Sequence, residues 1–145
     1  MKRKYIMHLL VLIILLFGSC SQNKGPEELY ADDLVKNNHS VLSPSQEYSL
    51  EMDEYFSDNV TGFSFVVRST SDNEEVYRSD DFYRLRDVTY LLWGDNDTIW
   101  VYSGDVGTLY WEKTSDGWSK NDYTKDTDSS IVPNALKELR PKYFS

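Results

Sequence analysis

The feature that most constrains the fold is a series of short β-like segments, separated by turn sequences, that runs from about Tyr48 to Trp118. In the first segment, Tyr48, Leu50 and Met52 alternate with polar residues, as in a strand with one buried face. Similar segments, rich in β-branched and aromatic residues, are predicted at 63–67, 75–78, 88–93, 98–102 and 108–113. Turns join them without the helical crossovers that a parallel sheet requires, so antiparallel pairing is expected. The sequence therefore predicts a mainly β protein, either a small antiparallel β-sandwich or a curled open barrel, with short helices at both ends.

The segment Thr98–Tyr102 is predicted to be a central strand. It follows Val88–Trp93 through the loop Gly94–Asp97, a sequence typical of a hairpin. Its aromatic residues Trp100 and Tyr102 fall on one face and its aliphatic residues on the other, so both faces are apolar. Such a strand is expected to be covered on both sides. The predicted core includes four residues of the β region: Phe65, Leu92, Trp100 and Leu109.

The segments on either side of this region are predicted to be less regular. Residues 20–46 are expected to be a tether that contains one short helix, from Pro26 to about Asn37, followed by a loop. A second short helix is predicted over Pro133–Leu139. Residues 47–145 would then form a single β domain, because a chain of this length supports one modest core and not two.

The N-terminus carries the features of an export signal. Three basic residues at positions 2–4 precede an apolar run, Ile6–Phe17, and the small residues Gly18 and Ser19 then lead to Cys20, the only cysteine of the chain. The run is shorter than the roughly 20 apolar residues of a membrane-spanning helix. Cleavage is therefore favoured over retention of this segment.

The segment Leu16–Cys20 resembles the lipobox of bacterial lipoproteins. The resemblance implies that residues 1–19 are a signal peptide and that Cys20 receives a lipid and becomes the mature N-terminus. The protein would then be a lipoprotein anchored to a membrane of the cell envelope, facing away from the cytoplasm. The alternatives are an ordinary secretory signal, in which Cys20 has no role, and an uncleaved membrane anchor.

The charge of the chain limits its partners. Removing residues 1–19 takes away three of the 15 basic residues and none of the 24 acidic ones, which leaves a formal charge of about −12. Nucleic acid is therefore not an expected partner, because binding to phosphates requires basic groups. Anionic headgroups would repel the domain as a whole, so the lipid at Cys20 must hold it at the membrane.

The sequence offers little for catalysis or metal binding. His39 is the one histidine after the signal segment, and neither a Gly-x-Ser-x-Gly motif nor a phosphate-binding glycine loop occurs. Asp95 and Asp97 have the spacing of the first ligands of a calcium loop, but the glycine and glutamate that complete an EF-hand are missing. We therefore expect no catalytic residue, no metal site and no cofactor.

Acidic and aromatic residues near the predicted turns are the candidate contacts. Asp95, Asp97 and Asp105 lie in loops at strand ends, and Trp93 and Trp111 would join them if their rings were exposed. Such a patch would suit a basic protein, a sugar or another cell-envelope component. The alternative is that the rings are core and that the carboxylates only end the hairpins and keep the protein soluble.

Three classes of function remain open. The first is a non-catalytic binding or interaction module, and the second is an inhibitor or immunity protein that neutralises a basic enzyme of the envelope. Ser103-Gly104 with the later Tyr110–Lys113 is similar to a local motif of the membrane-bound lysozyme inhibitors, which are small acidic lipoproteins. The match is out of register, so no residue role is carried over from it. The third class, an enzyme that uses carboxylates alone, has the least support, because a small domain has little room for a deep substrate cleft.

Overall fold

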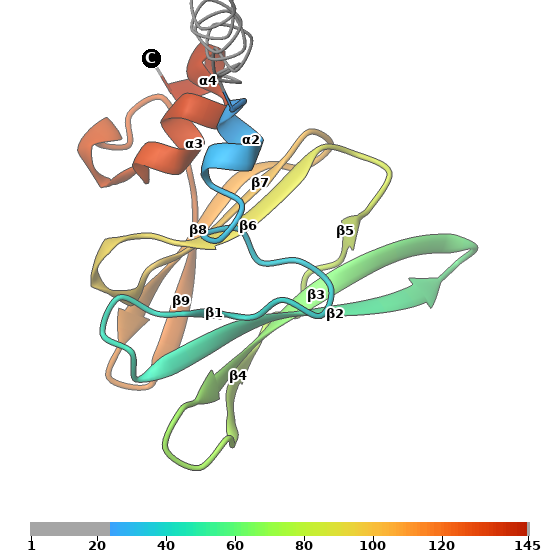
Figure 1. The fold of residues 1–145 in the computed structure, drawn as a ribbon, viewed down its shortest axis with the longest axis vertical. Coiled ribbons are helices and arrows are strands. Elements are labelled where there is room, and N and C mark those ends of the chain that lie inside the picture. Colours follow the sequence, from blue (N-terminus) through green and yellow to red (C-terminus); the bar gives the residue numbers. More distant parts are fainter. Residues whose placement is uncertain (1–23, 145) are drawn as a thin grey trace, which may run out of the picture.

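The computed structural model describes residues 24–144, apart from the side chain of Ser57. These residues form two antiparallel sheets, flanked by short helices (Figure 1). The first sheet has the strand order β1-β2-β3-β4, and β5 pairs with β3 beyond the end of β4. Its strands are β1 (Val41–Leu42), β2 (Tyr48–Ser57), β3 (Val60–Ser69), β4 (Glu75–Arg78) and β5 (Tyr83–Arg84). The predicted segments at 48, 63 and 75 are therefore all strands.

The second sheet is a four-stranded meander, β6-β7-β8-β9, in which each strand pairs with the next. Its strands are β6 (Thr89–Trp93), β7 (Ile99–Ser103), β8 (Gly107–Thr114) and β9 (Gly117–Asp122). The predicted hairpin is confirmed, since Leu92 lies opposite Trp100 and Trp93 opposite Ile99. The 3-10 turn η1 (Asp95–Asp97) joins these two strands.

Short helices flank the sheets at both ends of the chain. They are α2 (Pro26–Leu29), the 3-10 turn η2 (Ser129–Ile131), α3 (Asn134–Leu139) and α4 (Pro141–Phe144). The helix predicted over Pro133–Leu139 is confirmed as α3, and the following proline begins α4. No helix among residues 24–144 has the length and hydrophobicity needed to cross a bilayer. The predicted signal segment and Cys20 lie outside the described residues.

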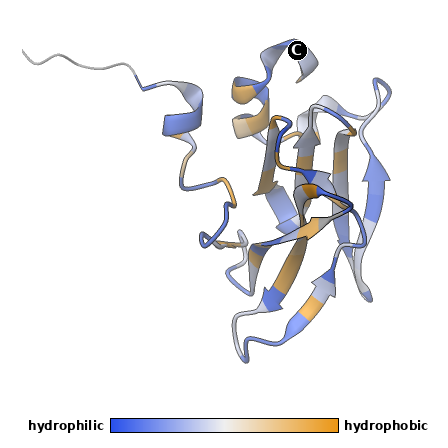
Figure 2. Cartoon of the chain, turned by 90° about the vertical axis from the view of Figure 1, so that its right-hand side faces the viewer, coloured by the Kyte–Doolittle hydropathy of each residue, from blue (hydrophilic) through white to orange (hydrophobic). Residues whose placement is uncertain are grey.

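The fold is mainly β and sandwich-like, as predicted, and the two sheets are not closed into a barrel. The core between them is built from inward-facing residues of both sheets: Leu50, Phe63, Phe65, Val67 and Tyr83 from the first, and Leu91, Trp93, Ile99, Val101, Leu109, Trp111 and Trp118 from the second. Figure 2 shows apolar residues concentrated on the strands and on the C-terminal helices, while the loops are mostly hydrophilic.

A second core covers the outer face of the β6–β9 sheet. There, Leu92, Trp100 and Tyr102 pack against Leu34 and against the C-terminal segment, which contributes Val132, Ala135, Leu136 and Phe144. All five residues of β7 are consequently buried, as predicted from its two apolar faces. The predicted core residues Phe65, Leu92, Trp100 and Leu109 are all buried as well.

The structure corrects the description of residues 26–46. The N-terminal helix ends at Leu29 and does not reach Asn37, because Leu34 forms an antiparallel bridge with Leu92 and Val35 N–H donates to the Leu91 carbonyl at 2.8 Å. Leu34 and Val35 thus pair with the edge of β6 through backbone groups that a longer helix would need for its own hydrogen bonds. The predicted loop at 39–46 contains β1, whose residues pair with Leu50 and Ser49. Residues 30–46 are part of the fold and not a free tether.

We predict that Trp100→Ala destabilises the protein by about 3–5 kcal/mol, enough to unfold a domain of ordinary stability. Trp100 has no exposed surface, and its ring stacks on Tyr110 with the ring centroids 4.8 Å apart. Phe56→Ala is the matched control, since that ring is 67 % exposed. Thermal or urea unfolding measures both variants. A Trp100→Ala protein that unfolds with the wild type would show that the outer core contributes little.

Candidate functional site

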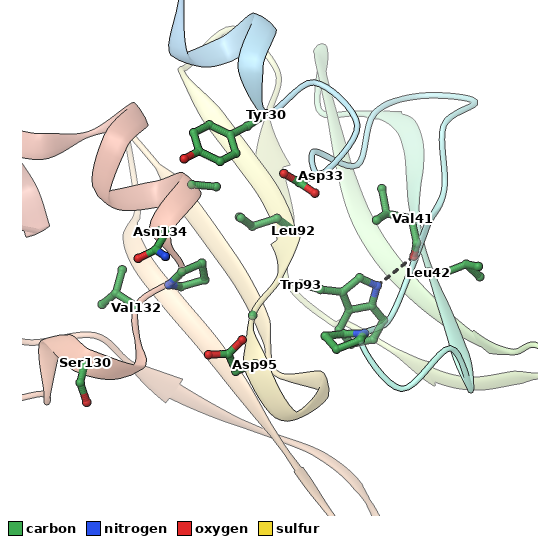
Figure 3. Close-up of a pocket in the computed structure, with 14 residues that line it drawn as sticks. Tyr30, Asp33, Val41, Leu42, Leu92, Trp93, Asp95, Ser130, Val132 and Asn134 are labelled. Carbon is green, nitrogen blue, oxygen red and sulfur yellow. Dashed lines mark hydrogen bonds between the residues drawn. The ribbon is translucent and has the colours of Figure 1, made fainter.

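A groove of about 600 Å³ lies on the flank of the β6–β9 sheet (Figure 3). It lies where the N-terminal segment, β1, the end of β6 and the start of α3 come together. We call it the acidic groove and define it by its lining residues: Tyr30, Asp33, Val41, Leu42, Pro44, Leu92, Trp93, Gly94, Asp95, Ser130, Val132, Pro133, Asn134 and Ala135.

Backbone pairing and core packing fix the walls of the acidic groove. The Leu34–Leu92 bridge holds the wall that carries Tyr30 and Asp33 against β6. On the opposite side, Val132 and Ala135 are buried in the outer core, so the start of α3 is held in place too. Because these two walls are both attached to the β6–β9 sheet, the groove is already formed in the free protein.

Trp93 belongs partly to the core and partly to the acidic groove. Its ring is buried between the sheets, and its Nε1–H donates to the Val41 carbonyl at 2.9 Å (Figure 3). This bond joins β6 of one sheet to β1 of the other and satisfies the indole nitrogen. The remaining 9 % of its surface is exposed, so Trp93 contributes an aromatic edge to the groove and not an exposed ring.

The groove is acidic because Asp33 and Asp95 line it and no lysine, arginine or histidine does. Figure 3 shows Asp33 at the Tyr30 end and Asp95 at the Ser130 end. Both carboxylates are exposed, and the walls between them include the apolar side chains of Leu42, Pro44 and Val132. The carboxylates suit the charge of a cationic side chain, and the apolar walls suit its aliphatic stem.

Three uncharged polar side chains add hydrogen-bonding capacity to the groove: Tyr30, Ser130 and Asn134. Hydrogen bonding to the Glu138 carboxylate raises the pKa of the Tyr30 phenol, with partial burial adding to the effect. The phenol is therefore neutral at physiological pH. The groove can accept hydrogen bonds through its carboxylates and can both donate and accept through these three residues.

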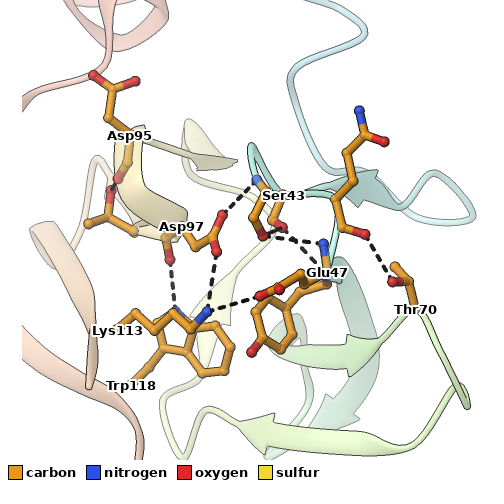
Figure 4. Close-up of polar contacts among 11 residues, drawn as sticks. Ser43, Glu47, Thr70, Asp95, Asp97, Lys113 and Trp118 are labelled. Atoms are coloured by element: carbon orange, nitrogen blue, oxygen red, sulfur yellow. Dashed lines mark hydrogen bonds and ion pairs between the residues drawn. The ribbon is translucent and has the colours of Figure 1, made fainter. Parts of the chain in front are cut away.

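Asp97 is adjacent in sequence to the groove but serves a structural purpose (Figure 4). Its side chain is buried, with Oδ1 accepting from Ser45 N–H at 3.0 Å and Oδ2 facing Lys113 Nζ at 3.4 Å. Its carbonyl accepts from Trp118 Nε1–H at 2.9 Å. Asp97 thus ties the β1–β2 turn to the β6–β7 turn, while Asp95 points away from this network (Figure 4). The sequence predicts Asp97 as a contact for a partner. Its side chain is buried, so the structure corrects this prediction.

The backbone explains why this turn has the sequence Asp-Asn-Asp. Asn96 and Asp97 adopt positive φ values of 54° and 56°. Asn and Asp tolerate this left-handed conformation better than other residues with a side chain. The turn therefore selects these residue types for its own geometry.

The other predicted contacts do not form one patch with Asp95. Asp105 lies in the β7–β8 turn, at the end of β7 opposite to the β6–β7 turn, and is 3.9 Å from Arg84. Trp111 is fully buried and meets Phe65 edge to face, so it is core and not a binding ring. Consecutive turns of a meander point in opposite directions, which separates residues that are close in sequence.

Sequence reasoning missed the groove residues outside the β region. The sequence predicts Tyr30 and Asp33 in the short helix of the N-terminal segment, Ser130 in a loop and Asn134 at the start of a helix. Only the docking of both terminal segments onto β6 brings them together, and no local pattern encodes that docking. The one available signal was Leu34 and Val35, two apolar residues that a free tether would not need.

No group of three or more His, Cys, Asp or Glu residues within 24–144 is arranged to hold a metal ion. His39 is exposed and sits in a turn in which it pairs with Lys36. Comparison with protein-family models, with curated proteins and with solved structures gives no significant match to this chain.

We predict that Asp97→Asn destabilises the protein at neutral pH by about 1–3 kcal/mol, through loss of a charged hydrogen-bond acceptor. Burial alone would raise the pKa of Asp97, but the hydrogen bonds from Ser45 and the charge of Lys113 outweigh it and hold the pKa below the ordinary value. A carboxyl whose pKa is lower in the folded state stabilises the fold at any pH above its unfolded-state pKa, which is about 3.9. This stabilisation is lost as the pH falls through the folded-state pKa.

The difference in the free energy of unfolding between the wild type and Asp97→Asn should therefore be largest at neutral pH and shrink below about pH 4. Urea unfolding at several pH values measures it. Asp105→Asn is the control, because that carboxylate is exposed and should change stability by only a few tenths of a kcal/mol. An Asp97→Asn difference that does not change with pH would show that folding leaves the pKa of this carboxyl unchanged, which would contradict the account.

Proposed function

We propose that this protein is a lipid-anchored, non-catalytic binding module of the cell envelope, and that the acidic groove receives a basic side chain of a protein partner. The lipidated Cys20 would attach the domain to a membrane on the side away from the cytoplasm. The observation that carries the proposal is the composition of the groove, where Asp33 and Asp95 have no cation among the lining residues.

The chemistry of the groove favours lysine or arginine over a small inorganic cation. Both side chains carry their charge on an aliphatic stem that packs on apolar surface while the head stays polar. The apolar wall of Leu42, Pro44 and Val132 suits such a stem, and the carboxylates at both ends suit the head. Arginine has the further advantage that its donors match a carboxylate in paired hydrogen bonds.

The net charge of the domain as a whole supports the same kind of partner. Residues 31–132, which contain both sheets, carry a formal charge of about −13. A domain with this field attracts basic partners from a distance and speeds their association, an effect that salt weakens. The groove would then fix the position of a partner that the overall charge has brought close.

An inhibitor or immunity protein is the specific form of this proposal in which the partner is a basic enzyme. The same charge supports it, since such a partner would be captured quickly and held by its basic surface. Stoichiometric loss of the partner's activity on binding would distinguish this form from a module that only localises its partner.

The proposal predicts that Asp33→Asn together with Asp95→Asn weakens binding of a lysine- and arginine-containing peptide by about tenfold or more, which is about 1.4 kcal/mol. Asparagine keeps the size of each side chain and removes its charge. Calorimetric titration at low and high salt measures the affinity, and amide chemical shifts of the wild type locate the peptide. The expected shifts cluster at Tyr30, Asp33 and Asp95.

Asp105→Asn combined with Asp116→Asn is the matched control, since it removes the same charge from exposed turns outside the groove. It should reduce the affinity much less than the groove variant does. Equal losses in the two double variants, or shifts spread over all acidic turns, would refute the groove as a site and leave only general charge attraction.

A further inference from the structure

The chain enters the fold at the end of the molecule that carries its helices. Figure 1 shows α2, α3 and α4 together at one end, with the turn between β3 and β4 at the other. Lys24, where the described structure begins, is four residues after Cys20. Even a fully extended chain of that length reaches only about 14 Å. A lipid at Cys20 would therefore keep this helical end within a short distance of the membrane surface.

The helical end exposes the kind of side chains that a membrane surface accepts. Leu29 in α2 is 60 % exposed and Tyr143 in α4 is 61 % exposed. Tyrosine is favoured at the level of the lipid headgroups, where its ring meets apolar chains and its hydroxyl meets water. Lys142, next to Tyr143, is exposed as well.

The charge of this end differs from that of the rest of the domain. Residues 24–30 and 133–144 together have a formal charge of about +1, whereas residues 31–132 have about −13. The cations here are Lys24, Lys137, Arg140 and Lys142, and the carboxylates are Glu27, Glu28 and Glu138. Two of these carboxylates already have partners, since Glu28 is 3.6 Å from Lys24 and Glu27 accepts from the Tyr90 hydroxyl.

Packing holds α4 in a fixed position on the sheet. Phe144 is buried in the outer core, and Arg140 Nη2 donates to the Tyr102 hydroxyl at 2.6 Å. The Arg140 guanidinium also lies 4.7 Å from the Tyr102 ring centroid and 5.1 Å from that of Tyr143. The exposed side chains of α4 are therefore presented by a rigid element.

From these observations we infer that the helical end, formed by α2, α3 and α4, is the surface with which this protein contacts the membrane. Leu29 and Tyr143 sit at the headgroup level, and Lys137 and Lys142 face the lipid phosphates. The acidic body of the domain points away from an anionic surface, which would repel it. This inference rests on the proposed lipid at Cys20 and adds an orientation to it.

The test uses the full-length lipidated protein in vesicles that contain phosphatidylglycerol. A nitroxide label is attached at Lys142→Cys in one sample and at Glu74→Cys, in the β3–β4 turn, in another. Lipidated Cys20 does not react with the label. We expect the label at 142 to be accessible to oxygen and shielded from a water-soluble nickel complex, and the label at 74 to show the reverse. Two labels with the same aqueous accessibility on membrane-bound protein would overturn the orientation.

Flotation with the vesicles separates this result from failure of the anchor. The wild type should float and Cys20→Ala should not, because the helical end alone is too weakly charged to hold an acidic domain. If the wild type does not float, the lipid anchor is wrong and the orientation is overturned with it. If Cys20→Ala floats as well as the wild type, the anchor is not at Cys20 and the inference is also overturned.

A second variant tests the apolar contacts themselves. Leu29→Ser with Tyr143→Ser should make the label at 142 more accessible to the nickel complex while flotation is retained. Phe56→Ser is the control, since this exposed ring lies on β2, outside the helical end. No change in the Leu29→Ser/Tyr143→Ser protein would show that these side chains do not touch the membrane.

Discussion

The burial of β7 on both faces is the constraint on which the rest of the structure depends. Its aliphatic residues Ile99 and Val101 lie in the core between the two sheets, and Trp100 and Tyr102 lie in the outer core beneath the C-terminal helices. A strand with two apolar faces cannot be exposed on either side without a large hydrophobic cost. The C-terminal helices are therefore required by the sheet, although each is only four to six residues long and too short to be stable alone.

The acidic groove follows from this arrangement. The segments that cover the outer face of the β6–β9 sheet come from both ends of the chain, and the groove lies where they meet beside Leu92 and Trp93. The Asp97 carboxylate, which binds Ser45 N–H and faces Lys113, fixes the turn that carries Asp95. One acidic residue of the turn thus stabilises the fold, which leaves its neighbour Asp95 free to face the groove.

The sequence predicted the strands well, because alternation and turn residues are local signals. The hairpin of Val88–Trp93 with Thr98–Tyr102 and the helix after Pro133 needed no tertiary information. The site was predicted poorly for the opposite reason, since the groove joins residues near 30, 44, 95 and 130 through contacts between distant segments. Asp95 was identified through its turn. Asp97, predicted by the same reasoning as a contact, is buried, and Trp111 is core, which is the alternative that the sequence left open.

The most direct test of this account is whether the sheets and the C-terminal helices unfold together, as a shared strand requires. Amide hydrogen exchange under native conditions measures the free energy of opening at each site. The account predicts equal values for the amides of β7 and for the Lys137 and Arg140 amides, which donate to the Pro133 and Leu136 carbonyls. Helix amides that exchange at a much lower free energy than those of β7 would show that the helices form a separate, weakly attached layer. The groove would then lack one fixed wall, which would contradict the account.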